Sequence, residues 1–153
     1  MKTFLFAIGL AILSSCSAQT TFKTFYTENN QQADFTMGFS TSLIGSFLAD
    51  DDEEIKELMK KAKHTRIMVF SENWEKTNSN FNKFIKRSGY DKLVKIKDDN
   101  DKISLYALEE KGVIKEIVVQ ISTGDELVLL GLKTNLTYDD LSKMFSDNHI
   151  VLN

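Results

Sequence analysis

A change in hydrophobic periodicity at Tyr90 constrains the fold more than any other feature of the chain. From this residue onward, apolar and polar residues alternate with a period of two, which is typical of β-strands with one buried face. Three short polar segments, KDDNDK, EEKG and STGDE, separate the runs, and connections this short join antiparallel neighbours. The sequence therefore predicts a C-terminal four-stranded antiparallel meander. The expected strands are residues 90–97, 102–110, 113–123 and 126–134.

The chain before this meander combines helical segments with two further strands. Phe35, Met37 and Phe39 alternate with Thr, Gly and Ser, which predicts a half-buried strand. Residues 67–70 are consecutive apolar residues and predict a central strand covered on both faces. Gly89 follows two basic residues, as is common just past a helix C-terminus. Apolar residues recur at helical spacing within residues 22–26, 43–48, 55–62 and 74–85.

The C-terminal part of the chain predicts one more helix. The TYDD segment, Thr137 to Asp140, has the pattern of a capping box at a helix start. Tyr138, Leu141 and Phe145 then share one helical face and are expected to point into the protein. Together these patterns predict one α+β domain over residues 22–153. We expect a mostly antiparallel sheet that ends in the four-strand meander, with helices packed mainly on one face.

The first fifteen residues have the pattern of a signal peptide. Lys2 precedes an unbroken apolar run, Phe4 to Leu13, which is too short to span a bilayer because a spanning helix needs roughly 20 residues. The LSSC segment that ends at Cys16 resembles the lipobox of bacterial lipoproteins. In that family the signal is cut before the cysteine, its thiol is joined to diacylglycerol, and the new amino terminus is acylated, for example with palmitate. Ordinary signal cleavage after Ala18 is the alternative.

The lipobox resemblance leads us to expect residues 1–15 to be removed and Cys16 to carry the lipid. Residues 16–21 would then be a polar tether, whose last five residues reach about 17 Å when extended. The remaining chain has 18 basic and 22 acidic residues, a net charge of −4, which gives no basic footprint for nucleic acid. Because Cys16 is the only cysteine, no disulfide is expected, and stability must come from the core.

Nearly the whole chain resembles a family of small Bacteroidota lipoproteins catalogued as domain of unknown function 4252. The resemblance is carried by the lipobox and by the segments FKTFYTENN, DFTMGFSTSLIGSFL, TRIMVFS, SGYDKLVKIKDDNDKISLYALEEKGVIKEIVVQI and LVLLGLKTNLTYDDLSKM. The family supplies no catalytic motif to transfer. Its genes often neighbour those of extracytoplasmic sigma and anti-sigma factors, which implies envelope signalling. By resemblance to Gram-negative lipoproteins, Ser17 rather than Asp after the lipidated cysteine implies sorting to the outer membrane. Bacteroidota lipoproteins exported to the cell surface carry an acidic stretch after the cysteine. The segment SAQTTFK lacks this stretch, which implies a domain that faces the periplasm.

Few residues of the chain have the spacing that metal binding or catalysis requires. The two histidines, His64 and His149, are far apart in sequence and favour surface positions over a zinc site. An EF-hand calcium loop that begins at Asp98 would need glycine at its sixth position, which is Ile103. Residues 98–101 (DDND) are therefore predicted to form a solvated turn. The acidic residues 50–54 are more typical of a helix N-terminus than of a calcium site, because the helix dipole favours acids there. Trp74 fits the apolar stripe of a helix better than a sugar-binding surface. Nucleophile-elbow and phosphate-loop motifs do not occur. We therefore predict no catalytic residue, no metal site and no cofactor.

The last strands are apolar on both faces, which exceeds what a sheet with one buried face requires. Val128, Leu130 and Leu132 are expected on one face, and Leu127 and Leu129 on the other. Tyr106, Leu108 and Val118 are expected to share the face of the second pair. Either a helix or the N-terminal segment covers the additional apolar face, or this face is an exposed patch for a protein partner or an acyl chain.

The sequence therefore favours a lipid-anchored protein of the cell envelope that is not an enzyme. We expect it to act as an interaction or signalling module in envelope homeostasis, attached to the membrane through Cys16 and open to a protein partner. A periplasmic carrier of a small hydrophobic ligand and a hydrolase without a recognised motif are the alternatives. The sequence does not predict the oligomeric state.

Overall fold

The structure of the chain, a computed structural model, describes residues 20–40 and 61–146. The expected signal peptide, Cys16 and His149 lie outside the described residues. So do the predicted helix at 43–48, the acidic residues 50–54 and most of the predicted helix at 55–62. Within the described part of the chain, no helix is long and apolar enough to cross a membrane.

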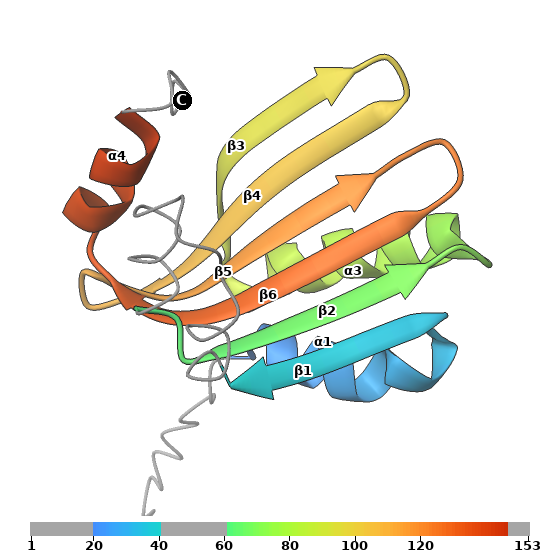
Figure 1. Cartoon of the computed structure of the whole chain (residues 1–153), viewed down its shortest axis with the longest axis horizontal. Helices are drawn as coiled ribbons and strands as arrows, with labels where there is room; N and C mark the ends of the chain where they lie inside the picture. The colour runs from blue at the N-terminus through green and yellow to red at the C-terminus, as the bar shows by residue number, and fades with distance from the viewer. Residues whose placement is uncertain (1–19, 41–60, 147–153) are drawn as a thin grey trace, which may run out of the picture.

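Six antiparallel strands form one sheet with the order β1-β2-β6-β5-β4-β3 (Figure 1). Every pair of neighbouring strands is antiparallel, which agrees with the mostly antiparallel sheet predicted from the sequence. The elements are α1 (Phe22–Asn29), a 3₁₀ turn (Asn30–Gln32), β1 (Phe35–Ser40), β2 (His64–Phe70), α3 (Trp74–Ser88), β3 (Asp91–Asp98), β4 (Asp101–Glu110), β5 (Val113–Ser122), β6 (Leu127–Leu136) and α4 (Tyr138–Ser146).

The predicted C-terminal meander is confirmed as β3 to β6, with each strand boundary within two residues of its expected place. Its period-two pattern is strong because one face of these strands meets a large aromatic core. The turn between β3 and β4 is the predicted solvated DDND segment. Asp99 in this turn has φ +46°, a left-handed conformation that Asp tolerates better than most residues.

Helices α1 and α3 lie behind the sheet in Figure 1 and cover one of its faces. Phe81 of α3 is fully buried there, and its ring lies 5.3 Å from Phe25 of α1 and 6.2 Å from Tyr106 of β4. Phe22 lies so close to β6 that a Cβ atom on Gly131 would sit 2.0 Å from its ring. Only glycine at position 131 therefore lets α1 pack this closely on the sheet. We call this side the covered face.

The predicted end of the long helix is confirmed at Gly89. This residue has φ +76°, and its backbone N–H donates to the Ile85 carbonyl, which is the usual left-handed cap. The predicted stripe of α3 also faces the core, with Phe81, Phe84 and Ile85 buried and Trp74 half-buried against the same cluster. The sequence therefore identified the C-terminal end and the buried side of α3.

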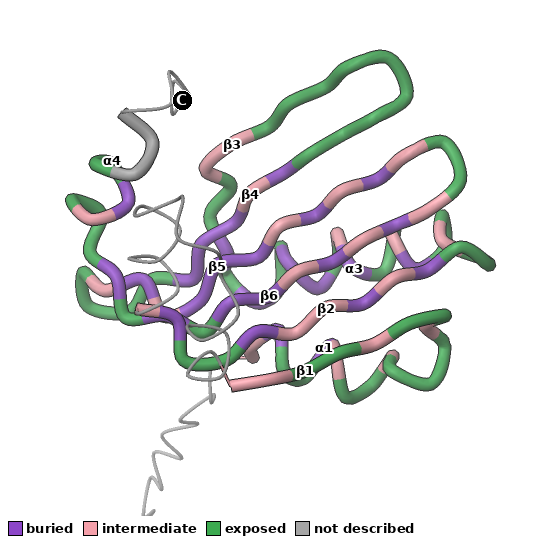
Figure 2. The backbone as a smooth tube through the Cα atoms, in the orientation of Figure 1, coloured by how far each residue is buried: buried purple, intermediate pink, exposed green. Residues whose placement is uncertain are grey.

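The two N-terminal strands are confirmed, but the burial expected of them is partly wrong. Met68 of β2 is fully buried on the covered face, whereas Ile67 and Val69 on the opposite face are only half-buried. On the edge strand β1, Phe35 is 47% exposed and Met37 45% exposed, so the apolar side of this strand is not buried (Figure 2). These residues lie on the sheet face away from α1 and α3, which explains the difference.

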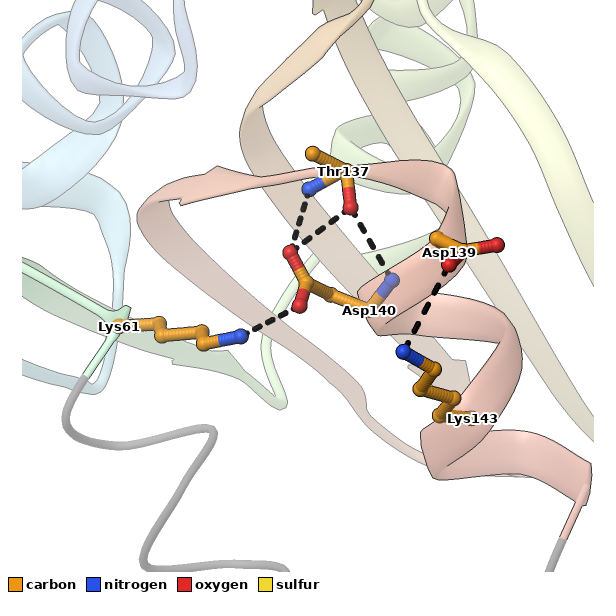
Figure 3. A network of polar contacts seen from close by, with 5 residues as sticks. All are labelled: Lys61, Thr137, Asp139, Asp140 and Lys143. Carbon is orange, nitrogen blue, oxygen red and sulfur yellow. Dashed lines mark hydrogen bonds and ion pairs between the residues drawn. The ribbon is translucent and has the colours of Figure 1, made fainter.

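Helix α4 packs at one end of the opposite face, where Leu141 is buried. The predicted capping box is confirmed, because the Thr137 hydroxyl accepts from the Asp140 N–H at 3.1 Å and the Asp140 carboxylate accepts from the Thr137 N–H at 2.9 Å (Figure 3). Lys61 forms an ion pair with the same carboxylate at 2.5 Å. Tyr138 is 41% exposed, so its expected inward position is wrong. The Phe145 side chain lies outside the described part.

Candidate functional site

The face of the sheet opposite α1 and α3, which we call the open face, carries apolar side chains on all six strands. The strand register places one such residue from each strand directly opposite its neighbour, in two parallel rows. The outer row consists of Phe35, Val69, Val128, Ile121, Ile103 and Ile96. The inner row consists of Met37, Ile67, Leu130, Val119, Leu105 and Val94.

Every residue of these two rows keeps contact with water. Met37 and Ile96 are each 45% exposed, and Ile103 is 37% exposed. The residues on the middle strands, such as Val128 and Ile121, are half-buried. Since strands lie about 4.8 Å apart, six strands present a band roughly 24 Å wide. A contiguous apolar band of this width on a folded domain is typical of an interaction surface.

The next row on the open face is buried on strands β2, β6, β5 and β4, so the solvent-exposed part of the apolar band ends there. Leu132 and Ile117 lie in this row and pack in one cluster with Ala62 and with Leu141 of α4. The cap of α4 is tied to the sheet through the Lys61–Asp140 ion pair, and this contact together with the Thr137 hydrogen bonds holds the pKa of Asp140 below its usual range. Helix α4 therefore covers one end of the open face, and Leu105 and Leu130 of the inner row pack against the same cluster.

The sequence placed the residues of β6 on the correct faces. Val128, Leu130 and Leu132 share the open face, while Leu127 and Leu129 lie in the covered core. Tyr106, Leu108 and Val118 belong to that same core, as expected. The sequence did not reveal that β1 and β2 extend the rows, because alternation within one strand says nothing about the register between strands.

A second feature, at the N-terminus of α1, was missed by the sequence analysis. Glu116 of β5 points into the covered face, is only 4% exposed, and accepts the Phe22 backbone N–H at 2.8 Å. The Tyr90 hydroxyl donates to the same Glu116 oxygen and accepts from the Phe22 N–H at 2.9 Å. A carboxylate at the start of a helix also meets the positive end of the helix dipole. Glu116 and Tyr90 therefore hold the N-terminal end of α1 in place.

The electrostatics of this buried group follow from its surroundings. Burial raises the pKa of Glu116 above its ordinary value of 4.5, while the hydrogen bonds from Tyr90 and Phe22 and the charges of Arg66 and Lys133 act in the opposite direction. Burial and the Glu116 charge also raise the pKa of Tyr90. The sequence contained a signal for this buried carboxylate, because Glu116 is the one acidic residue of β5 and alternates in phase with the inward-facing Val118 and Gln120. The hydrogen bonds of Glu116 are with the Phe22 N–H and the Tyr90 hydroxyl, so this residue caps the N-terminus of α1.

A polar network crosses the covered face between α3 and the sheet. The Gln120 carbonyl accepts from the Tyr106 hydroxyl at 2.8 Å, and the Gln120 amide donates to Asn82 at 3.2 Å and to Asn78. Buried polar groups need such partners because an unpaired one is costly. Every member is an amide or a phenol held in place by packing, and the network brings no nucleophile next to a base.

The metal and histidine candidates do not meet in the described part of the chain. His64 is exposed at the start of β2. Among residues 20–40 and 61–146, no group of three or more His, Cys, Asp and Glu side chains is arranged to hold a metal ion. Trp74 lies against the aromatic core, as its sequence position indicated.

Comparison with protein families gives one result. The family model described as Domain of unknown function (DUF4252) matches residues 21–144, which includes all the described strands. Neither a curated protein nor a solved structure matches the chain.

Proposed function

The chain belongs to the DUF4252 family, and from that premise we propose that it is a lipid-anchored, non-enzymatic binding module of the bacterial cell envelope. In this proposal Cys16 carries the lipid, and the domain stands at the outer membrane and faces the periplasm. The open face is the binding surface, and its occupant is a protein with an apolar surface of similar width. The observation that carries the proposal is the pair of apolar rows, which cross all six strands and stay exposed or half-buried.

The shape of the open face favours a protein over a small ligand. Small-molecule sites are concave and enclose most of the ligand. The two rows instead follow neighbouring strands across a sheet for roughly 24 Å, which is the scale of a protein–protein contact. Most residues of the two rows are Val or Ile, whose β-branched side chains have few rotamers to lose when a partner covers them. A hydrophobic ligand bound to the purified domain would favour a carrier, and turnover of a substrate would favour a hydrolase.

The short distance between Cys16 and α1 supports the anchored part of the proposal. Five residues separate Cys16 from Phe22, whose backbone N–H is held by Glu116. A lipid on Cys16 would therefore keep the sheet near the membrane, because the tether reaches about 17 Å at most. Partners within the same envelope layer would meet the open face at a raised local concentration.

The anchor is tested by replacing Cys16 with Ala in the full chain and fractionating the cells. We expect the wild-type protein in the membrane fraction, labelled by a fatty-acid probe, and the variant without label and no longer anchored like wild type. Cys16→Ser is the matched control, since it keeps the size of the side chain and also lacks the thiol. Normal fatty-acid labelling and anchoring of either variant would exclude lipidation at this residue.

The binding surface is tested by placing a photo-crosslinking amino acid at Ile121, in the middle of the outer row. The same amino acid at Lys83, exposed on α3 behind the sheet, is the control. We expect a discrete protein adduct from Ile121, none of that mass from Lys83, and loss of the Ile121 adduct when Ile103→Lys places a charge on the open face. An adduct that survives Ile103→Lys, or that forms equally from Lys83, would contradict the proposal.

A further inference from the structure

The two edges of the sheet differ in how they are protected against pairing with another strand. An edge strand presents unpaired backbone N–H and C=O groups, and proteins usually guard such edges with lysine, proline or a bulge. The β3 edge is protected by charge and by a bulge. Three lysines lie along it, Lys92, Lys95 and Lys97, and its pairing register with β4 shifts between Lys92 and Val94. Another strand would therefore pair poorly with β3.

The β1 edge lacks these devices. Its six residues, FTMGFS, include no charged residue and no proline, and all six pair with β2 in an unbroken register. No strand among residues 20–40 and 61–146 pairs with its other side, since β1 stands at the end of the strand order. Phe35 and Met37, which are nearly half exposed, lie beside this edge. The contrast with β3 indicates an edge that is suited to pairing.

The sequence of β1 also fits a second copy of itself. Phe35, Met37 and Phe39 lie on the open face with the same spacing on either side of Met37. In an antiparallel pair centred on Met37, Phe35 stands opposite the partner's Phe39, and the two Met37 residues stand opposite each other. On the other face Thr36 meets the partner's Gly38, a pair of small residues. A twofold axis at Met37 therefore pairs large apolar residues with each other and small residues with each other. This makes the β1 edge self-complementary, as an isologous dimer interface must be.

We propose that β1 pairs antiparallel with β1 of a second copy, centred on Met37, and forms a symmetric dimer with one continuous sheet. Pairing gives the outward-facing backbone groups of residues 35–39 partners on the second copy and buries the exposed parts of Phe35 and Met37. It also joins the two open faces into one apolar surface. This inference concerns the assembly of the chain and does not depend on Cys16 or on the partner of the open face. Because the paired strands are only six residues long, the dimer is concentration-dependent.

The pairing is tested by disulfide cross-linking of the full chain, and the unsubstituted chain measures any cross-linking through Cys16 itself. Met37→Cys places two thiols opposite each other at the twofold axis, at a separation within reach of a disulfide. Ile96→Cys on the β3 edge is the matched control, because Ile96 has the same exposed fraction, 45%, on the same face. With copper phenanthroline as oxidant, we expect a dimer band for Met37→Cys at least several times stronger than for Ile96→Cys. Equal bands for the two variants would overturn the proposal.

Charge substitution at the same two positions gives an independent test. Met37→Lys places a lysine on β1 like those of β3, whereas Ile96→Lys leaves β1 unchanged. By sedimentation of the detergent-solubilised full chain over a concentration series, wild type and Ile96→Lys should dimerise and Met37→Lys should remain a monomer. A wild-type monomer at all concentrations, or a Met37→Lys dimer as tight as wild type, would contradict the pairing. Cross-linking of Met37→Cys to a different protein would assign the edge to an extended partner segment and overturn self-pairing.

Discussion

The two faces of the sheet carry similar apolar side chains but meet different surroundings. On the covered face, α1 and α3 bury residues such as Phe70 and Leu129 completely. On the open face, the neighbouring residues Val69 and Leu130 of the same strands remain half-buried. The difference does not arise from a lack of apolar side chains on the open face, because both faces carry Val, Leu and Phe. It arises from α1 and α3, which lie over the covered face and bury its residues.

The strongest effect is expected on the covered face. Phe81 is fully buried and its ring contacts rings from α1, α3 and β4. Phe81→Ala should lower the free energy of unfolding by about 3–5 kcal/mol, because a large cavity remains in a core that cannot collapse fully. Urea unfolding measures the effect, and Phe81→Leu should lose much less. A loss of under about 1 kcal/mol for Phe81→Ala would show that this face does not form the main core.

The cap of α1 should give the next largest effect. Glu116→Ala leaves the Phe22 N–H and the Tyr90 hydroxyl without their buried acceptor, which should cost roughly 2–4 kcal/mol. Glu116→Gln keeps an acceptor oxygen and is the matched control, with a smaller loss. Urea unfolding at neutral pH compares the two. Similar stability of Glu116→Ala and wild type would show that α1 is held by packing alone.

The same residue predicts a pH dependence with a definite sign. Burial raises the pKa of Glu116, so the native state binds its proton more tightly than the unfolded state, whose pKa is near 4.5. The contribution of this group to stability is therefore largest below pH 4.5 and decreases as pH rises through the folded pKa. Wild type should lose stability over this range relative to Glu116→Gln. The opposite slope would mean that the hydrogen bonds outweigh burial.

A smaller effect is expected at α4, which covers one end of the open face. Thr137→Ala removes the side-chain cap of this helix and should cost about 1 kcal/mol. Thr137→Ser retains the hydroxyl and should stay near wild type. Thermal unfolding and hydrogen exchange of the α4 amides measure the change. Unchanged protection of these amides in Thr137→Ala would show that the Leu141 contact suffices to hold the helix.

The smallest effect on stability is expected in the two apolar rows. Ile103→Thr keeps a β-branched side chain at a position that is 37% exposed, so it should change the free energy of unfolding by about 0.5 kcal/mol or less. The same substitution should weaken partner binding, because it places a hydroxyl in the apolar band. A loss of stability comparable to that of Phe81→Ala would show that the open face is part of the core.

Much of the fold was accessible from the sequence because each signal was local. The alternation after Tyr90 gave the four strands of the meander, the TYDD segment gave the cap of α4, and Gly89 gave the end of α3. These features depend on contacts between residues that are close along the chain. The family resemblance was also correct, since the family model covers residues 21–144.

The parts that were missed depend on contacts between distant segments. The exposure of Met37 follows from the place of β1 at the sheet edge, and pairing order is not encoded in the alternation of one strand. Tyr138, the first residue of α4, is exposed although it shares a helical face with the buried Leu141. The role of Glu116 requires α1 to meet β5 across 94 residues of sequence. Lipidation of Cys16 and the envelope location stay predictions.

The central claim, that the open face is occupied by a partner in the cell, is tested most directly by thiol accessibility. Ile103→Cys provides a single free thiol in a chain whose own Cys16 is proposed to be lipidated, and Lys83→Cys is the control on α3. We predict that Ile103→Cys reacts readily with a maleimide in the purified protein and slowly in intact envelopes, while Lys83→Cys reacts equally in both. Equal reactivity of Ile103→Cys in the two settings would contradict the proposed binding surface.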